Sequence, residues 1–397
     1  MARGSSSPQR GHRNPGSQPA LRRQNTLRVI EVLAQGGPTT QARLARATGL
    51  STGTISNIVK DLHTDRRITT RAVVDSGRRA IEIALSDARV SIGLDIDATS
   101  MRLLVTHVDH ELVGEVLQPL PMGHDPTSTL RTARRLVETA LDMHGLSPND
   151  VIGVGVSLPT ILDEHRRSLT SDPGFPNWHD EDLAGIAETA FPFPVIFEND
   201  ANVQALAHVT WGPYSLNSVL AAVKVGTGVG AGLIVNGRIL RGAFGGTGEL
   251  GHLNISPLGE RCHCGNRGCL QTVASVDKVL ADVKRARHLH VAPSVADVVE
   301  LARRRDPATL RVLEEAGQAI GVALASLVTL VNPHAVVISG PLAPVGAPLL
   351  EPISRSVTRH AHPAIGPRTV ISMSQLGDRA EALGASALAA LGAIVPT

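Results

Sequence analysis

The sequence of 397 residues predicts an α/β protein with a winged helix-turn-helix at its N-terminal end. Three observations support this prediction. Residues 1–89 hold 15 Lys and Arg against 6 Asp and Glu, whereas the rest of the chain holds 23 against 30, so a basic head precedes an acidic body. In the head, apolar residues recur at helical spacing, and a glycine separates two such segments where a helix-turn-helix has its turn. In the body, apolar strand-like runs alternate with helical segments and glycine-rich loops.

The composition argues against several classes of protein. Aromatic residues make up only 2% of the chain, which argues against binding of nucleic acid by stacking bases on aromatic rings. The three cysteines lie between Cys262 and Cys269, so they cannot form the disulfide scaffold of a secreted protein. Residues 1–20 contain Ser, Gly, Pro and Arg without an apolar stretch, so we expect a disordered basic tail rather than a signal peptide. We therefore expect a cytoplasmic protein.

One long uncharged stretch, residues 316–350, has the composition of a membrane span. Asn-Pro-His at 332–334 and Gly-Pro at 340–341 divide it into pieces too short to cross a bilayer. We instead predict a buried helix that ends near Val331, followed by a strand over Ala335–Ser339. No membrane partner is expected.

The head contains three predicted helices. The first spans about Leu21–Gln35 and ends at a Gly-Gly-Pro sequence, and the second spans Gln41–Thr48. Gly49 supplies the tight turn, and Ser51 or Thr52 caps the third helix. The basic charge suits a polyanion such as DNA, although a solvated basic tail has the same composition. The order of helix, turn and helix favours DNA.

The third helix has two distinct faces. Its apolar stripe consists of Ile55, Ile58, Val59 and Leu62, which recur at helical spacing. The opposite face presents short polar and basic side chains that suit base edges and phosphates. These predicted DNA-binding residues are Thr52, Thr54, Ser56, Asn57 and Lys60. The alternative is a helical hairpin used for dimerisation, which would show the same stripe.

A predicted wing follows the third helix. Apolar residues alternate over 81–85 as in a strand, and residues 75–79 form a turn that carries Arg78 and Arg79. Arginines at such a tip fit a narrow minor groove. We therefore assign residues 21–88 to a winged helix-turn-helix DNA-binding domain.

The body is predicted to be an α/β protein with two glycine-rich loops of the phosphate-binding type. The expected elements of its first part are strands over 90–96, 101–108, 151–156 and 194–197, a helix over 128–144 and a helix that opens at Ala201. Further along, strands over 220–225 and 231–235 flank Gly226-Thr227-Gly228, and Asn236-Gly237 closes a hairpin. Glycines there let backbone N–H groups approach an anion such as phosphate, although a glycine-rich hairpin occurs without one.

A cluster of metal-ligand residues gives the clearest chemical signal. Cys262, Cys264 and Cys269 lie in one tight glycine-containing loop. His252 precedes that loop by ten residues. Three thiolates and one imidazole form a closed tetrahedral shell for Zn²⁺ with no position left for water, so we predict a structural zinc ion. His263 is a rival ligand, and the alternative is a redox or free-thiol cluster.

Taken in order, these motifs resemble the ROK family (repressors, open reading frames, kinases). The motifs are the winged helix, the Asp95-x-x-x-Thr99 loop, Asn199-Asp200, Gly226-Thr227-Gly228, Glu249-x-x-His252 and the Cys-x-Cys-Gly-x-x-Gly-Cys loop. The resemblance covers about residues 21–391 and is most specific at the cysteine loop. It implies two actin/hexokinase-like (ribonuclease H-like) lobes with a ligand cleft between them. The first lobe would span 89–200, completed by 376–397 with a last helix around 379–391, and the second would span 201–375.

The resemblance also implies roles for individual residues. Asp200 stands where the kinases of the family keep the base that accepts a proton from the attacking sugar hydroxyl. The implied sugar-binding residues are Asn199, Asp200, Glu249, His252 and Gln271. The implied phosphate-loop residues are Asp95, Thr99, Gly226, Thr227 and Gly228. The zinc ion would brace the sugar-binding loop through His252. From the residues alone, Asp200 could equally cap the following helix, and Glu249 could be a surface carboxylate.

Four positions depart from the kinase pattern. Asp97 replaces the glycine of the first phosphate loop, where a carboxylate repels a polyphosphate. Thr160 stands where kinases usually have a glycine beside the sugar, and Gln271 stands where they usually have a glutamate. Ser339-Gly340-Pro341 replaces a Gly-Gly pair. Together these residues argue against use of ATP with Mg²⁺, whereas binding of a sugar could survive in altered form.

The sequence therefore predicts a DNA-binding transcriptional regulator, a repressor of sugar-utilisation genes, that binds a sugar or sugar derivative in a kinase-like domain. Its expected partners are operator DNA, the sugar effector and further copies of itself in a homodimer or homotetramer. The alternative is an active hexose or N-acetylhexosamine kinase with an auxiliary head. A third possibility is an adaptor whose body binds a protein.

Overall fold

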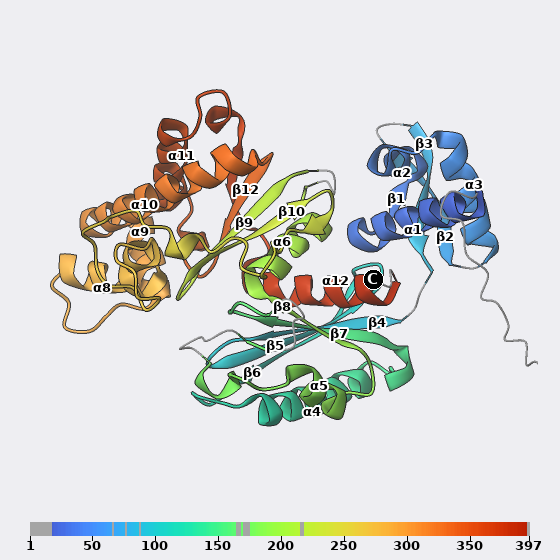
Figure 1. The fold of residues 1–397 in the computed structure, drawn as a ribbon, viewed down its shortest axis with the longest axis horizontal. Helices are drawn as coiled ribbons and strands as arrows, with labels where there is room; N and C mark the ends of the chain where they lie inside the picture. The colour runs from blue at the N-terminus through green and yellow to red at the C-terminus, as the bar shows by residue number, and fades with distance from the viewer. Residues whose placement is uncertain are drawn as a thin grey trace, which may run out of the picture.

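The computed structural model describes residues 18–65, 67–75, 78–86, 89–163, 168–169, 175–214 and 218–394 (Figure 1). A small N-terminal head lies beside a body that contains two five-stranded sheets. Two helices, α6 (Asp200–Thr210) and α12 (Ala380–Ile394), lie between these sheets. The predicted α/β fold class is confirmed.

Helices and a small sheet close one hydrophobic core in the head. The first helix begins at Gln18, three residues before its predicted start, and residues 1–17 of the predicted tail lie outside the described residues. Gly49 makes the predicted turn with a φ of 70°, which glycine adopts without steric cost. The sheet has the order β1-β3-β2. The bounds are α1 Gln18–Gly36, β1 Thr39–Thr40, α2 Gln41–Thr48, α3 Thr52–Thr64, β2 Ile68–Asp75 and β3 Arg78–Leu85.

The first lobe of the body is a sheet with the order β6-β5-β4-β7-β8. Its central strand β4 pairs antiparallel with β5 and parallel with β7, and β7 pairs parallel with β8. Helices α4 and α5 cover the outer face, because alternate side chains of β4, from Val90 to Ile96, pack against them. The bounds are β4 Val90–Ile96, β5 Ser100–His107, β6 Leu112–Pro119, α4 Pro126–Met143, β7 Val151–Leu158, α5 Leu183–Ala190 and β8 Val195–Asn199.

The second lobe is a sheet with the order β11-β10-β9-β12-β13. Its outer face packs against α8 to α11, and its inner face packs against α6 and α12. The bounds are β9 Leu220–Val225, β10 Val229–Val235, β11 Arg238–Ile239, α7 Gln271–Ala274, α8 Val276–Ala286, α9 Val295–Arg303, α10 Pro307–Val331, β12 Ala335–Ser339, α11 Ala347–His360 and β13 Val370–Met373. The predicted Asn236-Gly237 turn closes β10 and β11, with both residues at positive φ.

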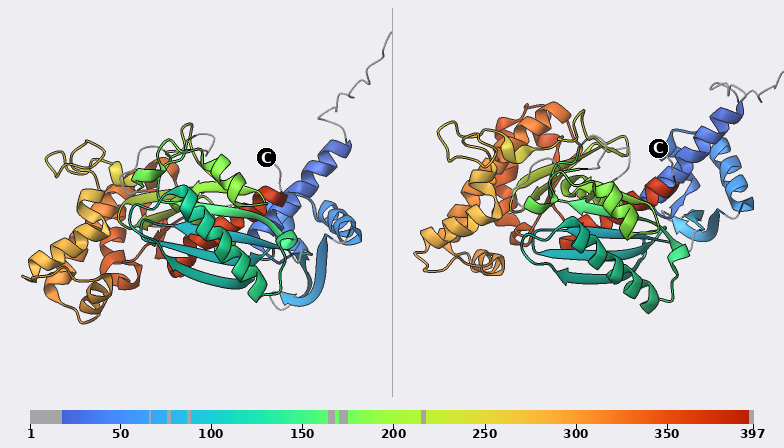
Figure 2. Two further views of the ribbon diagram at one scale, coloured as in Figure 1. Left: turned by 90° about the horizontal axis from the view of Figure 1, so that it is seen from below. Right: turned by 60° about the horizontal axis from the view of Figure 1, so that its bottom comes forward.

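Glycine allows the middle helices to approach both sheets closely. A Cβ added to Gly93 of β4 or Gly155 of β7 would overlap the backbone of α12. A Cβ added to Gly232 of β10 would overlap the backbone of α6 at Ala201. The C-terminal helix thus packs on the first lobe, as the resemblance implied, and both views in Figure 2 show its far end beside α1.

The predicted uncharged helix is α10, and it ends at Val331 as expected. By length and composition it is the one helix of the described residues that could cross a membrane. However, 61% of its most apolar window is buried inside the protein, against the second sheet and the neighbouring helices. A core helix accounts for this composition.

Candidate functional site

The third helix of the head presents the polar face that the sequence predicts. The side chain of Ser51 accepts a hydrogen bond from the backbone N–H of Thr54 at 3.1 Å, so Ser51 rather than Thr52 is the N-cap. The apolar stripe is buried in the head. The exposed positions are Thr52, Gly53, Ser56, Asn57, Lys60, His63 and Thr64. Gly53, His63 and Thr64 were not predicted.

One predicted DNA-binding residue, Thr54, serves the helix itself. It is half-buried, and its hydroxyl lies 2.8 Å from that of Ser51. Both groups therefore complete the cap. The Thr54 hydroxyl is therefore less available for a contact outside the helix than the exposed side chains on the next turn are.

The wing is a hairpin of β2 and β3 whose last paired residues are Asp75 and Arg78. Arg79 is exposed, whereas Ser76, Gly77 and the side chain of Arg78 lie outside what the structure describes. An ion pair of 2.9 Å between Arg43 of α2 and Asp75 fixes the wing to the helix-turn-helix. This ion pair therefore joins the two predicted DNA-binding elements.

The head contacts the body through the C-terminal part of α1. Val32 packs in the hydrophobic cluster that contains Leu388 of α12. A Cβ on Gly37, which follows α1, would lie 3.4 Å from the ring of His110 in the hairpin between β5 and β6. The ring of His110 lies 4.9 Å from that of Trp211, next to the end of α6. This joint connects the head with both lobes.

The predicted metal ligands converge. The ligand atoms of His252, Cys262, Cys264 and Cys269 all lie within 4.8 Å of one another. The Sγ atoms of Cys264 and Cys269 are 3.8 Å apart, and Nδ1 of His252 is 3.6 Å from Sγ of Cys262. A tetrahedral ion with bonds of about 2.3 Å to sulfur and about 2.0 Å to nitrogen would separate its ligand atoms by about 3.5 to 3.8 Å. The four side chains therefore fit a tetrahedral metal ion.

His252, and not its rival His263, converges with the three cysteines. His263 is outside the group of converging ligand atoms, and its ring lies edge-on to that of His252 with centroids 5.3 Å apart. Gln271 donates a hydrogen bond from Nε2 to Sγ of Cys262 at 3.1 Å. The amide of Gln271 therefore contacts the metal cluster. It also lies close to the glycine loop, because a Cβ added to Gly228 would be 3.6 Å from Oε1 of Gln271.

Two predicted sugar-binding residues lie at the start of α6. Asn199 is the N-cap, because its Oδ1 accepts a hydrogen bond from the backbone of Asn202 at 3.2 Å. Its Nδ2 donates to the carbonyl of Thr160 in the loop after β7 at 3.1 Å. Asp200 is the first residue of the helix and not its N-cap, although its Oδ1 accepts a hydrogen bond from the backbone N–H of Ala201 at 2.7 Å. Its side chain is buried.

Asp200 is ion-paired with a lysine that sequence analysis missed. Nζ of Lys224 lies 2.7 Å from Oδ2 of Asp200 and 3.0 Å from Oε1 of Glu381. Lys224 lies on β9 and Glu381 at the start of α12, so three elements meet here. A lysine inside a strand and a glutamate in the last helix carry no recognisable motif, which is why neither was predicted.

The predicted phosphate loop contributes one residue to the same cluster. Burial and the negative charge of Glu381 raise the pKa of Asp95 to about 7, whereas the positive charge of Lys224 lowers it. Oδ1 of Asp95 accepts a hydrogen bond from Ser157 at 2.8 Å. Thr99 and Asp97 are exposed on the hairpin that follows, and Asp97 turns its side chain to the backbone of Ala98.

Glu249 lies on the loop between β11 and the metal cluster. Its Oε2 is 3.8 Å from Nε2 of His252, so His252 directs one nitrogen to the metal cluster and the other toward Glu249. The loop also reaches the first lobe. Arg241 forms an ion pair of 2.6 Å with the buried Glu198 of β8, and a Cβ on Gly246 would lie 3.8 Å from Ile161. The loop thus spans the two lobes beside Asn199 and Thr160.

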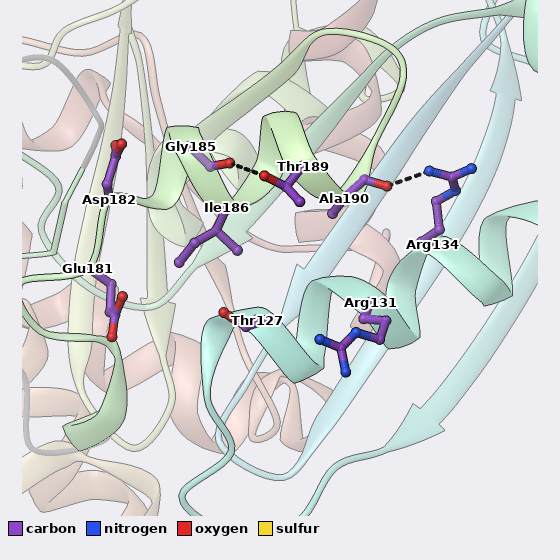
Figure 3. A pocket seen from close by; sticks show the side chains of 9 residues that line it. All are labelled: Thr127, Arg131, Arg134, Glu181, Asp182, Gly185, Ile186, Thr189 and Ala190. Atoms are coloured by element: carbon purple, nitrogen blue, oxygen red, sulfur yellow. Dashed lines mark hydrogen bonds between the residues drawn. The ribbon is translucent and has the colours of Figure 1, made fainter.

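A separate groove lies on the outer face of the first lobe, between α4 and α5 (Figure 3). The groove has a volume of about 530 Å³. Arg131 and Arg134 of α4 line one side, and Glu181 and Asp182, which directly precede α5, line the other. The sheet separates this groove from α6 and α12. The groove is therefore separate from Asp200 and its neighbours.

Comparisons with known proteins agree with this division into head and body. Residues 91–391 match the sequence profile of the ROK family, and residues 22–79 match that of the MarR family. A xylose repressor of Bacillus spizizenii is 26% identical over 371 residues, which cover 93% of this chain and 95% of that protein.

Solved structures show the same pattern of coverage. A ROK family transcriptional regulator, a homologue of the E. coli MLC protein, matches with a TM-score of 0.76 and 23% identity over 94% of this chain and 97% of its own. A ROK family glucokinase from Streptomyces griseus, solved with glucose and AMPPNP, matches with a TM-score of 0.63 and 26% identity. The glucokinase covers only 75% of this chain, although 98% of its own length is matched.

Proposed function

The chain belongs to the ROK family, and from its added winged-helix head we infer that it is a sugar-responsive transcriptional repressor. The observation that carries this inference is the exposed polar face of α3, which lies beside a wing. The match to the xylose repressor extends over 93% of the chain, whereas the match to the glucokinase extends over only 75%. Exposed Ser56, Asn57 and Lys60 suit base edges and phosphates in a major groove. Arg79 on β3 suits the adjacent backbone or minor groove.

We propose that the head binds a pseudo-palindromic operator as a homodimer or homotetramer, with one third helix in each successive major groove. Basic charge in the head and acidic charge in the body restrict the contact with DNA to the head. The similarity to transcriptional regulators supports a cytoplasmic location for this activity.

The effector we propose is a neutral sugar or sugar derivative bound between the lobes. Asn199, Asp200, Glu249 and Gln271 offer amide and carboxylate groups, which are the partners of sugar hydroxyls. The loop that carries Glu249 contacts both the metal cluster and the first lobe, so ligand binding there would change how the lobes are held.

The converging side chains of His252, Cys262, Cys264 and Cys269 support a structural Zn²⁺ ion. Soft thiolates with imidazole favour zinc over calcium or magnesium, and four protein ligands leave no site for a catalytic water. The ion would fix the ring of His252, whose Nε2 faces Glu249, and so position the sugar-binding loop.

Helix α12 offers a direct route from the cleft to the head. It begins beside Glu381, in contact with Lys224, and its last turns pack in the cluster that includes Val32 of α1. Fifteen residues span about 22 Å as one rigid helix. We propose that closure of the cleft on the sugar moves α12 and displaces the heads from their operator spacing, which lowers DNA affinity by a shift in population.

The test is operator binding by the full-length, zinc-loaded protein to DNA selected from a random-sequence library. Affinity that falls steeply with salt, and that is lost when residues 1–88 are removed, would support a DNA-binding head. Equal affinity in the truncated protein would contradict it. Phosphoryl transfer from ATP across a sugar panel, with Asp200→Ala as control, tests the alternative of an active kinase.

A further inference from the structure

One cysteine of the metal cluster differs from the other two in its exposure to solvent. Cys264 is exposed, whereas Cys262 is only 6% exposed and Cys269 is 0% exposed. Residues 263–267 are all exposed, so Cys264 lies on the outer part of the cysteine loop. The chain contains these three cysteines and no others. A thiol reagent in solution therefore reaches Cys264 before either of the other two.

The surroundings of Cys264 favour reaction of its sulfur. Arg261 and Arg267, both exposed, pair in a backbone bridge at the base of the loop. The acidic residue nearest to Cys264 in the sequence, Glu260, is neutralised by Lys278, whose Nζ lies 2.7 Å from its Oε1. Nearby cations favour the thiolate form of a cysteine, which is the form that reacts. An exposed sulfur in a positively charged loop is thus a candidate for oxidation.

A second thiol lies within reach of Cys264. The Sγ atoms of Cys264 and Cys269 are 3.8 Å apart, so they would have to approach by about 1.8 Å to form a disulfide. The segment that connects them contains Gly265 and Gly268, both at positive φ. Two glycines in so short a segment give the backbone the freedom that this approach needs.

The third thiol is engaged by other groups. Sγ of Cys262 accepts a hydrogen bond from Nε2 of Gln271 at 3.1 Å and lies 3.6 Å from Nδ1 of His252. Cys262 is therefore held at the inner side of the cluster, next to the imidazole. The neighbouring thiol that is left to pair with Cys264 is that of Cys269.

We propose that Cys264 is an oxidation site and Cys269 its partner, so that hydrogen peroxide converts the metal cluster into a Cys264–Cys269 disulfide and releases the zinc ion. The inference rests on the structural zinc ion of the proposed function. It adds a chemical signal, a peroxide, to which the protein responds in addition to a sugar.

The oxidation has two steps. The thiolate of Cys264 attacks one oxygen of the peroxide, so that an S–O bond forms, the O–O bond breaks and the leaving hydroxide is protonated to water. The thiolate of Cys269 then attacks the sulfenic acid of Cys264, so that an S–S bond forms, the S–O bond breaks and a second hydroxide is protonated to water. Two thiolates lose two electrons, and one peroxide is reduced to two water molecules.

The disulfide affects the proposed sugar-binding loop. Only His252 and Cys262 remain as ligands, which is half of the set that a structural zinc site needs. Nε2 of His252 lies 3.8 Å from Oε2 of Glu249, so loss of the ion frees the imidazole that positions this carboxylate. The oxidised protein should therefore bind its operator without responding to the sugar.

Peroxide treatment of the full-length, zinc-loaded protein tests the inference. Released zinc is followed with a chromogenic chelator, and the cysteines are mapped by mass spectrometry after free thiols have been blocked. We expect release of one zinc ion per chain, a Cys264–Cys269 disulfide, and renewed zinc binding after reduction with dithiothreitol. At low peroxide, dimedone, which traps sulfenic acids, should label Cys264 before either other cysteine.

Matched variants exchange a thiol for an imidazole at two positions. Cys264→His keeps four ligands but removes the exposed thiol, so peroxide should release zinc at least tenfold more slowly than from the wild type. Cys262→His makes the same exchange at a buried position and keeps Cys264, so its zinc should be released at nearly the wild-type rate. The zinc content of each variant is measured before peroxide is added.

The dimedone measurement on the wild type decides the question even if neither variant retains zinc. First labelling of Cys262 or Cys269 would overturn the proposal. Zinc that stays bound while glutathione in the same solution is oxidised would overturn it as well, and would leave the proposed metal site intact. A wild type that binds no zinc at the outset would contradict the metal site and, with it, this inference.

Discussion

The ring of His110 lies edge-on to that of Trp211, with centroids 4.9 Å apart, at the point where the head meets both lobes. Trp211 also donates its indole N–H to the carbonyl of His110 at 3.0 Å. Gly37, directly after α1, packs against the same imidazole. One residue from the head, one from the turn between β5 and β6, and one from the end of α6 thus form a single contact.

Acidification should weaken this joint. Burial lowers the pKa of His110 to about 4, although a backbone hydrogen bond to Ala34 acts in the opposite direction. The unfolded chain, with a histidine pKa of about 6.5, binds more protons between these values, so stability falls as the pH drops from about 6.5 toward 4. The loss amounts to at most about 3 kcal/mol.

The variant His110→Asn removes the titrating group and suits the positive φ of 75° at this position. Urea unfolding of both proteins at pH 7.5 and 4.5 measures the difference. The wild type should lose more stability on acidification than the variant does. Equal losses would show that His110 does not titrate on unfolding.

Loss of one metal ligand should remove the metal ion and lower stability. Cys269→Ser replaces a buried thiolate, and we expect zinc content to fall from one ion per chain to near zero, with a cost of several kcal/mol. The control is His263→Ala, which alters a neighbouring imidazole outside the converging group. Plasma emission spectrometry and thermal unfolding check both. Full zinc content in Cys269→Ser would refute the assigned ligand set.

Two residues of α3 should act differently on DNA. Lys60→Ala removes a phosphate contact, so affinity should fall for all sequences and the salt slope should drop by about 1. Asn57→Ala should cost about 1–3 kcal/mol on the preferred operator and relax its specificity. Fluorescence anisotropy at several salt concentrations separates the two effects, with Lys278→Ala as a control on the body. Unchanged affinity in both variants would exclude α3 as the reading helix.

Close packing of α12 on the first sheet should make Gly93 intolerant of a side chain. A Cβ there would overlap the carbonyl of Ala382, so Gly93→Ala should destabilise the protein by about 3 kcal/mol. Gly153→Ala on the neighbouring strand β7 is the control, because its Cβ would lie 3.3 Å from its nearest neighbour, the carbonyl of Pro194. Chemical denaturation should give the larger loss for Gly93→Ala, and the reverse order would contradict this packing.

The sequence predicted the features that depend on local spacing. The observed bounds agree with the predicted ones for α2, β4, β9, β12 and the end of α10. Gly49 and Asn236-Gly237 form the predicted turns with positive φ angles. The metal cluster was predicted because its ligands lie close together in the chain. Element ends moved by up to three residues, as at α1, because capping depends on hydrogen bonds that spacing alone does not reveal.

Contacts between distant segments could not be predicted in this way. Lys224, Asp200 and Glu381 lie on separate elements, and only the fold brings them together. The same holds for Arg241 with Glu198 and for the packing of Gly93 against α12. The sequence therefore indicated which residues have useful chemistry, and the fold determined which of them meet.

The measurement that tests the account most directly is operator affinity with and without effector. The full-length, zinc-loaded protein would first be screened against a sugar panel by calorimetry, and the tightest sugar would then be added at saturation to an operator titration. We expect operator affinity to fall at least fivefold, and Glu249→Ala to bind the same operator without responding. Equal operator affinity in the free and the sugar-saturated wild type would contradict a sugar-responsive repressor.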